Sequence, residues 1–228
     1  MEHWSAEHVA ALAATVATAI LLVGCAHRRP DAWAVGAGRI LALVILGGYV
    51  CEQLTYALRG EWTARLNLPL HLTDAVTFAS IVALWRPERA LFVELVYFWA
   101  LTASLQAVLT PDLGASFPDP LFLGYFATHG GAVVAASLLV FGAGRAPRPG
   151  AVGRVYAITA GFAALAAAGT LATGGNYMYL RRKPSDGSLL DVMGPWPVYI
   201  VVAAWFGLAV FAVLAALAPT RTGARSRD

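Results

Sequence analysis

Residues 158–171 read Ile-Thr-Ala-Gly-Phe-Ala-Ala-Leu-Ala-Ala-Ala-Gly-Thr-Leu, a run without a charged side chain and without alternation of polar and apolar positions. A membrane-spanning strand alternates between residues facing lipid and residues facing the lumen, so this run predicts a helix. A helix also pairs its backbone groups within its own segment, as a bilayer demands. The run and its neighbours are long enough for the roughly 20 apolar residues that cross about 30 Å of hydrocarbon.

The whole chain has the same character. Hydrophobic residues make up 59% of its 228 residues and charged residues only 13%, about half the charged share of a typical soluble domain. We therefore predict an all-α, polytopic membrane protein, a single seven-helix transmembrane domain over residues 1–228. The expected spans are about 7–26, 33–57, 69–85, 91–109, 120–143, 152–173 and 196–218. Span 69–85 is the weakest, because it is short and begins with His71 and Asp74.

The distribution of Lys and Arg predicts the orientation, because these residues concentrate on the cytoplasmic side. One side of the predicted topology holds Arg28, Arg29, Arg86, Arg89, Arg145, Arg148, Arg154, Arg221, Arg225 and Arg227. The other side holds Arg59, Arg65, Arg181, Arg182 and Lys183. This excess places the N-terminus outside and residues 219–228, a basic tail, in the cytoplasm. The short groups of basic residues form no continuous face for phosphates, so we predict no nucleic-acid partner.

Residues 22–25, Leu-Val-Gly-Cys, match a bacterial lipoprotein cleavage box. The residues before this run include no Lys or Arg, whereas an export signal has a positive first segment. Arg28 and Arg29 follow directly and favour retention of that end in the cytoplasm. We therefore expect the first span to stay uncleaved.

Ionisable groups within a bilayer are costly unless they are paired or hydrated, so each is a functional candidate. Arg39 and Glu94 fall near cytoplasmic ends, where they serve as interfacial anchors or pair with each other. The remaining candidates converge on the outer side: Glu52, His71, Asp74, Gln106 and His129. A polar pocket that opens outward explains their placement most simply.

Asp74 lies three positions after His71, so on a helix the two residues share a face and can hydrogen-bond. The hydroxyl of Thr73 either points into the bundle or bonds back to the carbonyl of Pro69, as threonines in membrane helices often do. His129 precedes Gly130 and Gly131, which permit close approach of a neighbouring helix. His129 is therefore either an interhelical hydrogen-bond donor or a proton-transfer group. Its separation from His71 and Asp74, without HxxxH-type spacing, leads us to predict no metal and no other cofactor.

The last outer loop contains Gly174-Gly175-Asn176-Tyr177-Met178-Tyr179-Leu180-Arg181-Arg182-Lys183. Its tyrosines lie where interfacial aromatic residues normally lie. Its basic residues are unusual on this side. They either contact lipid phosphates from outside or form a solvated end of the loop.

Several motifs together resemble a known family. They are Leu68-Pro69-Leu70-His71-Leu72-Thr73-Asp74, Glu94-Leu95-Val96-Tyr97-Phe98-Trp99, Ser104 to Asp112, Thr128-His129-Gly130-Gly131, Gly174 to Leu180, and Leu189-Leu190-Asp191 with Gly194-Pro195-Trp196-Pro197. In this order, over residues 50–200, they resemble the YwaF-like bacterial integral membrane proteins. They are also similar to vertebrate transmembrane acyltransferases of ether-linked phosphatidylethanolamine and, more distantly, to androgen-induced transmembrane hydrolases. This resemblance implies a multi-pass protein of the cell inner (plasma) membrane, with phospholipids or fatty-acyl lipids as partners.

The resemblance also implies roles for individual residues. Thr73 occupies the position at which relatives often have a nucleophilic Cys, and His129 matches the family histidine. The departure from Cys shifts the expectation toward the threonine type of enzyme, which needs a stronger base nearby. The implied enzyme is a lipid acyl hydrolase or acyltransferase with Thr73 as nucleophile, His129 as base, and Asp74 or His71 as orienting group.

Substrate contacts are expected from Gln106, Asn176, Tyr177, Arg182 and Glu52, with the two amides as hydrogen-bond donors to an oxyanion. The alternative is a transporter, channel or ligand-binding protein with a path of Glu, His and Asp side chains. Against that alternative, the sequence has no pair of broken-helix repeats and no Lys within a span. A purely structural role is the third interpretation, and the number of polar residues in the spans disfavours it.

Overall fold

The computed structural model describes residues 4–28, 32–184 and 187–219. Within these residues the chain forms helices joined by turns and loops, without a strand. The long helices are α1 (Ala6–Arg28), α2 (Ala32–Leu58), α3 (Leu72–Trp85), α4 (Ala90–Trp99), α6 (Pro120–Ser137), α7 (Ala151–Thr173) and α8 (Val198–Leu217). A π-helical turn, η1 (Ala100–Ser104), joins α4 to α5 (Leu105–Leu109), and a second, η2 (Leu138–Gly142), extends α6. Two 3-10 turns, η3 (Tyr177–Tyr179) and η4 (Leu189–Met193), lie between α7 and α8.

Six of the predicted segments coincide, to within a few residues, with helices that are long and apolar enough to cross a bilayer. The exception is α3, which begins at Leu72 and not at residue 69. Its 14 residues give a length of about 21 Å at 1.5 Å per residue, less than the roughly 30 Å of a hydrocarbon core. The helix begins late because the carboxylate of Asp74 accepts the backbone N–H of His71, at 2.9 Å, and so caps the first turn. The assignment of α3 as a seventh span stays a prediction.

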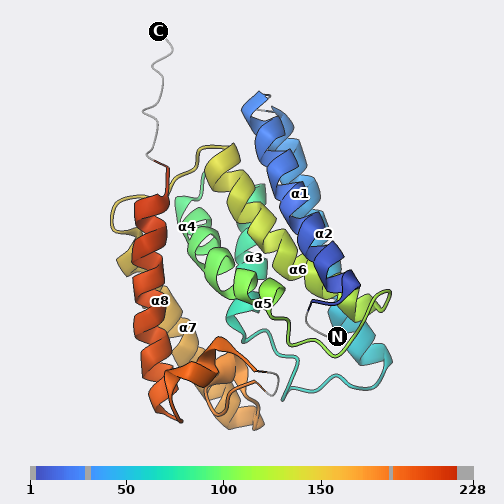
Figure 1. Ribbon diagram of the computed structural model, residues 1–228, viewed down its shortest axis with the longest axis vertical. Coiled ribbons are helices and arrows are strands. Elements are labelled where there is room, and N and C mark those ends of the chain that lie inside the picture. Colours follow the sequence, from blue (N-terminus) through green and yellow to red (C-terminus); the bar gives the residue numbers. More distant parts are fainter. Residues whose placement is uncertain (1–3, 29–31, 185–186, 220–228) are drawn as a thin grey trace.

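Successive helices run in alternating directions, so the start of α1 and the end of α8 lie at opposite ends of the bundle (Figure 1). We call the end with the starts of α1, α3, α6 and α8 the N-terminal end and the other end the C-terminal end. The orientation in the membrane, with the N-terminal end outside and residues 219–228 in the cytoplasm, stays a prediction. Residues 220–228 of that basic tail lie outside the described part of the chain.

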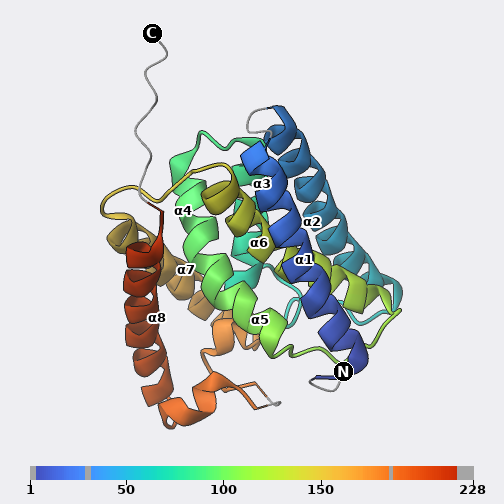
Figure 2. The same cartoon turned by 45° about the horizontal axis from the view of Figure 1, so that its top comes forward.

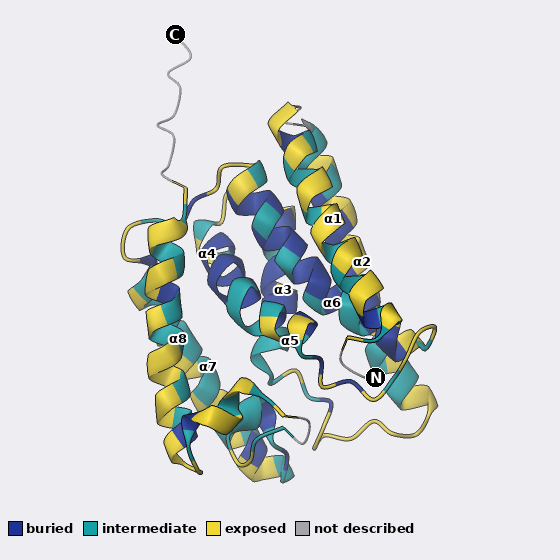
Figure 3. Cartoon of the chain, viewed as in Figure 1, coloured by how far each residue is buried: buried dark blue, intermediate teal, exposed yellow. Residues whose placement is uncertain are grey.

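The centre of the bundle is α6, which packs against α1, α2, α3, α4 and α5. Figure 3 shows buried residues concentrated on α3, α4 and α6, whereas α1 and α8 are largely exposed. The exposed positions carry large apolar side chains, such as Ile20 and Leu21 on α1 and Val201 and Trp205 on α8. An apolar exposed surface on long helices is the surface that lipid covers.

Glycines allow the central helices to approach closely. A Cβ on Gly124 of α6 would lie 2.4 Å from Cγ of Glu52, and a Cβ on Gly48 of α2 would lie 2.7 Å from Cβ of Ala127. As expected from the sequence, Gly130 and Gly131 also contact neighbouring helices. A Cβ on Gly130 would lie 2.7 Å from Oγ1 of Thr15 on α1. Small residues thus bring helix backbones together in a bilayer, where no hydrophobic effect drives them to associate.

The pair α7–α8 lies beside α4, on the opposite side of the bundle from α1 and α2 (Figures 1 and 2). Side chains from α4 hold the pair: the Tyr97 hydroxyl donates to the carbonyl of Leu214, and the Trp99 indole N–H donates to Oγ1 of Thr159. Near the N-terminal end, the loop after α7 is pinned to the loop before α3. The buried Tyr177 hydroxyl donates to the carbonyl of Ala64 at 2.6 Å and accepts the backbone N–H of Leu68 at 3.1 Å.

Candidate functional site

The candidate site lies at the N-terminal end of the bundle, where α3 and α6 begin and the loop after α7 crosses them. His71 is the residue immediately before α3, and its ring contacts Tyr177 and Tyr179 with centroid separations of 5.4 and 5.6 Å. The expected bond between the side chains of His71 and Asp74 takes another form, since Asp74 accepts from the backbone of His71. The imidazole of His71 is therefore held by the two tyrosine rings, and Asp74 fixes the start of the helix.

Two acidic residues lie on α2 and α3, which pack against each other. Glu52 of α2 and Asp74 of α3 are both partly buried and lie close enough for their charges to interact. The Thr128 hydroxyl of α6 is 3.5 Å from Oε2 of Glu52, and Gly124 provides the room for the Glu52 side chain beside α6. Glu52 therefore belongs to the same polar region as Asp74, as the sequence predicts.

Thr73 lies in the first turn of α3, partly buried. Four and seven residues further along are Thr77 and Ser80, which are 2% and 0% exposed. Residues at this spacing share one face of a helix, so Thr73 lies on the face of α3 that turns into the bundle. Its carbonyl accepts the Thr77 hydroxyl. Among the hydrogen bonds of the described residues, none joins the Thr73 hydroxyl to His129 or to Pro69.

His129 lies on the buried face of α6, in line with Ala132 and Ala136, both fully buried. Its ring meets the ring of Tyr125 edge-on at 4.1 Å. The Nδ1 atom is buried and has no hydrogen-bond partner among the described residues, although part of the residue stays accessible. A buried polar atom without a partner costs free energy, so an uncommitted ring nitrogen here requires a functional explanation.

The register between α5 and α6 sets the depth of His129. The Tyr125 hydroxyl donates to the carbonyl of Ala107, at 2.9 Å. The two helices run in opposite directions. His129 lies one turn further into the bundle than Tyr125 on α6, and Ser104 lies about one turn further into the bundle than Ala107 on α5. His129 and the π-helical turn η1 therefore lie at a similar depth on two helices that pack together.

Sequence reasoning missed two residues in this region. The hydroxyls of Ser104 on η1 and Ser80 on α3 are fully buried and, like Nδ1 of His129, have no partner in the described part of the chain. The backbone of η1 is wound more loosely than an α-helix, and such π-helical turns occur frequently at functional sites. The run Ala100–Ser104 contains no Gly or Pro, and we find no sequence signal for the insertion.

Most of the predicted substrate-binding residues near the N-terminal end of the bundle form hydrogen bonds within local structure. Asn176 closes its own loop, since Nδ2 donates to the carbonyl of Arg182 and Oδ1 accepts the backbone N–H groups of Arg181 and Arg182. Exposed Gln106 donates to the Thr110 hydroxyl at the end of α5. Tyr177 presents its ring to His71 while its hydroxyl joins two loops. The Arg182 side chain is exposed.

Tyr179, in the loop after α7, connects this loop to His71, Asp112 and α8. Its hydroxyl donates to Oδ2 of Asp112 at 3.0 Å, and its carbonyl accepts the hydroxyl of Tyr199 on α8. Burial, and then the nearby negative charge of Asp112, raise the pKa of Tyr179 above its usual value. The phenol is therefore neutral at physiological pH and is available as a hydrogen-bond donor.

The two polar groups predicted at the opposite end of the bundle do not pair with each other. Glu94, 1% exposed, accepts from Arg148 at 2.7 Å and from Arg154 at 2.9 Å. The hydrogen bond to Glu94 raises the pKa of Arg148, so this arginine is charged at any physiological pH. Arg39 lies over the ring of Trp85 at 5.6 Å. The predicted pairing of Arg39 with Glu94 was wrong because two arginines far along the chain, Arg148 in the loop before α7 and Arg154 in α7, reach the carboxylate.

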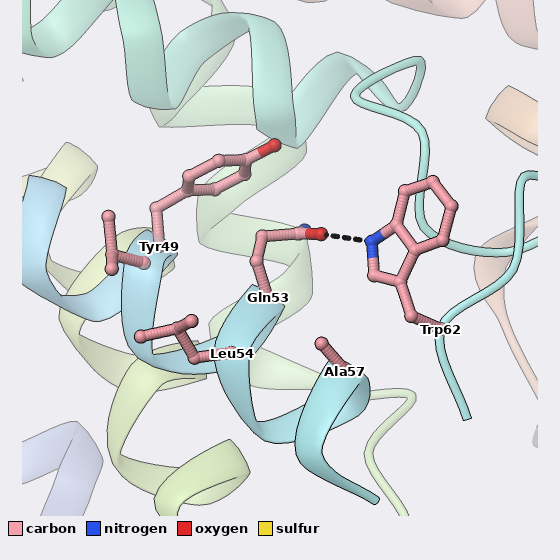
Figure 4. A pocket seen from close by; sticks show the side chains of 6 residues that line it. Tyr49, Gln53, Leu54, Ala57 and Trp62 are labelled. Atoms are coloured by element: carbon pink, nitrogen blue, oxygen red, sulfur yellow. Dashed lines mark hydrogen bonds between the residues drawn. The ribbon is translucent and has the colours of Figure 1, made fainter. Parts of the chain in front are cut away.

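A surface groove lies outside the candidate site. A shallow groove of about 360 Å³ runs along the outside of α2 and is lined by Tyr49, Gln53, Leu54, Ala57 and Trp62, among others (Figure 4). There the Trp62 indole N–H donates to Oε1 of Gln53, at 2.8 Å. The described residues contain no cluster of three or more His, Cys, Asp and Glu side chains that could hold a metal ion.

The fold and the polar region define a polytopic α-helical membrane protein with buried histidine, hydroxyl and carboxyl groups gathered near one end. The family model of the TMEM164 family matches residues 3–215, and the chain belongs to this family. The TMEM164 family is a transmembrane family related to ether-lipid acyltransferases, so the resemblance to that group is confirmed at the level of the family. The affiliation with YwaF-like bacterial proteins stays a prediction. A search of curated proteins and a search of solved structures each gave no match.

Proposed function

We propose that the protein is a lipid acyl hydrolase or acyltransferase in which Thr73 is the nucleophile and His129 the base, in a pocket near the outer leaflet. Membership of the TMEM164 family supports a lipid-related acyltransferase. The observation that carries the proposal is the uncommitted imidazole of His129 on the buried face of α6. A base must exchange its proton with the substrate, and a ring already committed to structural hydrogen bonds does so less readily.

In the proposed reaction the Thr73 oxygen attacks the carbonyl carbon of a lipid ester, and His129 takes the hydroxyl proton. The tetrahedral intermediate then collapses, the bond to the leaving alcohol breaks, and His129 returns the proton to that alcohol. An acyl-threonine ester remains. Water or the hydroxyl of a lysolipid, deprotonated by His129, attacks the carbonyl carbon of this ester. The bond between the acyl group and the Thr73 oxygen then breaks, His129 returns the proton to that oxygen, and a fatty acid or a new lipid ester is released.

The position of Thr73 in the first turn of α3 supports stabilisation of the intermediate. The N-terminus of a helix carries partial positive charge and unpaired backbone N–H groups. A developing oxyanion near Thr73 would interact with that charge without reorganisation of the protein. This helix end is better suited to the role than the amides of Asn176 and Gln106, because both amides already donate to local acceptors.

The other proposed residues act around this centre. Asp74 fixes the start of α3 and thereby the position of Thr73, and the ring of His71 packs against the rings of Tyr177 and Tyr179. Exposed Arg182 is placed for a lipid phosphate at the surface, and the ring of Tyr177 and the carboxyl of Glu52 line the polar region.

The test compares purified variants in mixed micelles of a phospholipid ester and a lysophospholipid acceptor. We expect Thr73→Val and His129→Gln to lose at least about 100-fold in turnover, the typical contribution of a general base. Thr73→Ser keeps the hydroxyl and should retain most activity. Ser137→Ala, near the far end of α6, is the control. Wild-type turnover by both Thr73→Val and His129→Gln would contradict the mechanism.

The alternative of a transport path is less well supported. The polar groups of the candidate site and the Glu94 cluster at the other end are separated by buried apolar residues of α3, α4 and α6, including Ala83, Val96 and Ala136. A proton or ion path would need polar side chains or water through this layer.

A further inference from the structure

A groove of about 500 Å³ runs between α1, α2 and α6. This volume is within the range of roughly 300–1,000 Å³ that is usual for small-molecule sites. We call it the α1–α6 groove. Its lining includes Ala10 and Ala14 of α1, Gly130 and Gly131 of α6, and the rings of Phe122 and Phe126. The small side chains of Ala10 and Ala14 therefore leave the space open on the α1 side, and aromatic side chains of α6 border it.

The chemistry of the lining changes along the groove. Glu7, the charged residue of this lining, is at the N-terminal end of α1, where one of its carboxylate oxygens accepts the backbone N–H of Phe117 at 3.0 Å. Deeper in, the hydroxyl of Thr15 donates to the carbonyl of Ala11 in its own helix, at 2.9 Å. The deeper part therefore offers an occupant almost entirely hydrocarbon surface, while the rim offers a polar group.

The position of the groove limits what can fill it. Its walls are α1, α2 and α6, each long and apolar enough to span a bilayer. From Ala10 to Thr18 the groove follows α1 for about 12 Å at 1.5 Å per residue, which lies within the hydrocarbon core if α1 spans the membrane. At that depth an apolar trough with one polar rim matches a lipid, with its polar part at the surface and one chain lying inward.

We infer that the α1–α6 groove binds one acyl chain of a membrane lipid. The inference deepens the proposed function, on which it rests, because the groove and His129 use adjacent faces of the same helix, and the bound chain is that of the substrate ester. Gly130, at the floor of the groove, directly follows His129 in α6.

The experiment uses a phosphatidylcholine with a photoactivatable diazirine halfway along one acyl chain, reconstituted with the full-length protein. Labelled peptides are then identified by mass spectrometry. Label should appear in the peptides of α1 and α6 that line the groove. Ala14→Phe fills the groove, since Ala14 is exposed on α1 and lines it. Ala13→Phe adds the same ring to an exposed position that does not line the groove.

We expect Ala14→Phe to reduce this labelling about tenfold, because a bound chain loses the apolar contact of several methylene groups, and Ala13→Phe to leave it unchanged. Labelling of Thr73→Val should equal that of the wild type, which separates binding from chemistry. Unchanged labelling of Ala14→Phe, or label confined to other helices, would overturn the inference. Lost labelling with undiminished ester turnover would overturn the assignment of the bound chain to the substrate.

Discussion

At the residue scale, the polar side chains differ in how fully they are committed to structure. Tyr177 uses its hydroxyl as both donor and acceptor between two loops, and Asp74 caps a helix. His129, Ser104 and Ser80 have buried polar atoms without partners in the described residues. Buried polar groups in proteins are nearly always paired. Under the proposed function, we expect a polar group of the substrate to bind near these three unpaired groups.

The contact between Glu52 and Gly124 gives a prediction at this scale. Gly124→Ala would place a Cβ 2.4 Å from Cγ of Glu52 and 2.9 Å from the carbonyl oxygen of Gly48, so we expect a loss of about 1–3 kcal/mol in the free energy of unfolding, as for other overpacked sites. Thermal unfolding in detergent measures the change. The control is Gly161→Ala on α7, where a Cβ meets nothing within 4 Å. That change should be neutral or stabilise by up to about 1 kcal/mol. Equal stability of the two variants would contradict the close contact.

At the scale of elements, the polar region depends on how α3 begins and how α4 and α5 are joined. Both features arise from local backbone structure, the cap at His71 and the π-helical turn η1. The pair α7–α8 is joined to this centre at both ends as well as along α4. Near the N-terminal end Tyr177 connects the loop after α7 to the loop before α3, and near the C-terminal end Glu94 accepts from Arg148 and Arg154.

Glu94→Gln tests the second connection. The change keeps the shape of the side chain and removes the charge that two guanidinium groups share. Both arginines are more than a third exposed, so water replaces part of the lost hydrogen bonding. We therefore expect the free energy of unfolding to fall by about 1–2 kcal/mol. Hydrogen exchange of residues 148–158 should accelerate. Glu88→Gln, which removes an exposed pair with Arg86 at 3.8 Å, should change neither quantity. An unaltered exchange rate in Glu94→Gln would show that the start of α7 is held by other contacts.

At the scale of the whole molecule, the open question is whether α3 crosses the membrane. Its 14 residues are short for a bilayer, yet α3 is packed against α2, α4 and α6 in the interior of the bundle. A helix surrounded by protein can be shorter than the hydrocarbon thickness, because its ends are sheltered by its neighbours and not by lipid.

Single-cysteine labelling decides the topology. In a background with Cys25 and Cys51 replaced by Ser, Glu61→Cys and Glu88→Cys place thiols on either side of α3, and both positions are exposed or partly exposed. A membrane-impermeant maleimide should label the first in intact cells and the second only after lysis, since the excess of Lys and Arg places the loop after α3 in the cytoplasm. Labelling of both in intact cells would show that α3 returns to the side from which it started.

The sequence by itself determined that the protein is helical and membrane-embedded, and it determined the helix boundaries closely. Runs such as residues 158–171 are too apolar for water, and a bilayer leaves the backbone little choice other than a helix. The sequence also identified Glu52, His71, Asp74 and His129 as polar residues of one end.

Only the tertiary structure decided which of these groups meet. A helix in lipid is apolar on nearly every face, so hydrophobic periodicity does not reveal its rotation, and the partner of a buried charge lies far along the chain. Glu94 therefore pairs with Arg148 and Arg154 and not with Arg39, the Tyr177 hydroxyl binds loop backbone, and the π-helical turn at Ser104 appears without a sequence signal. These outcomes depend on the packing of one helix against another, which the composition of a single segment does not specify.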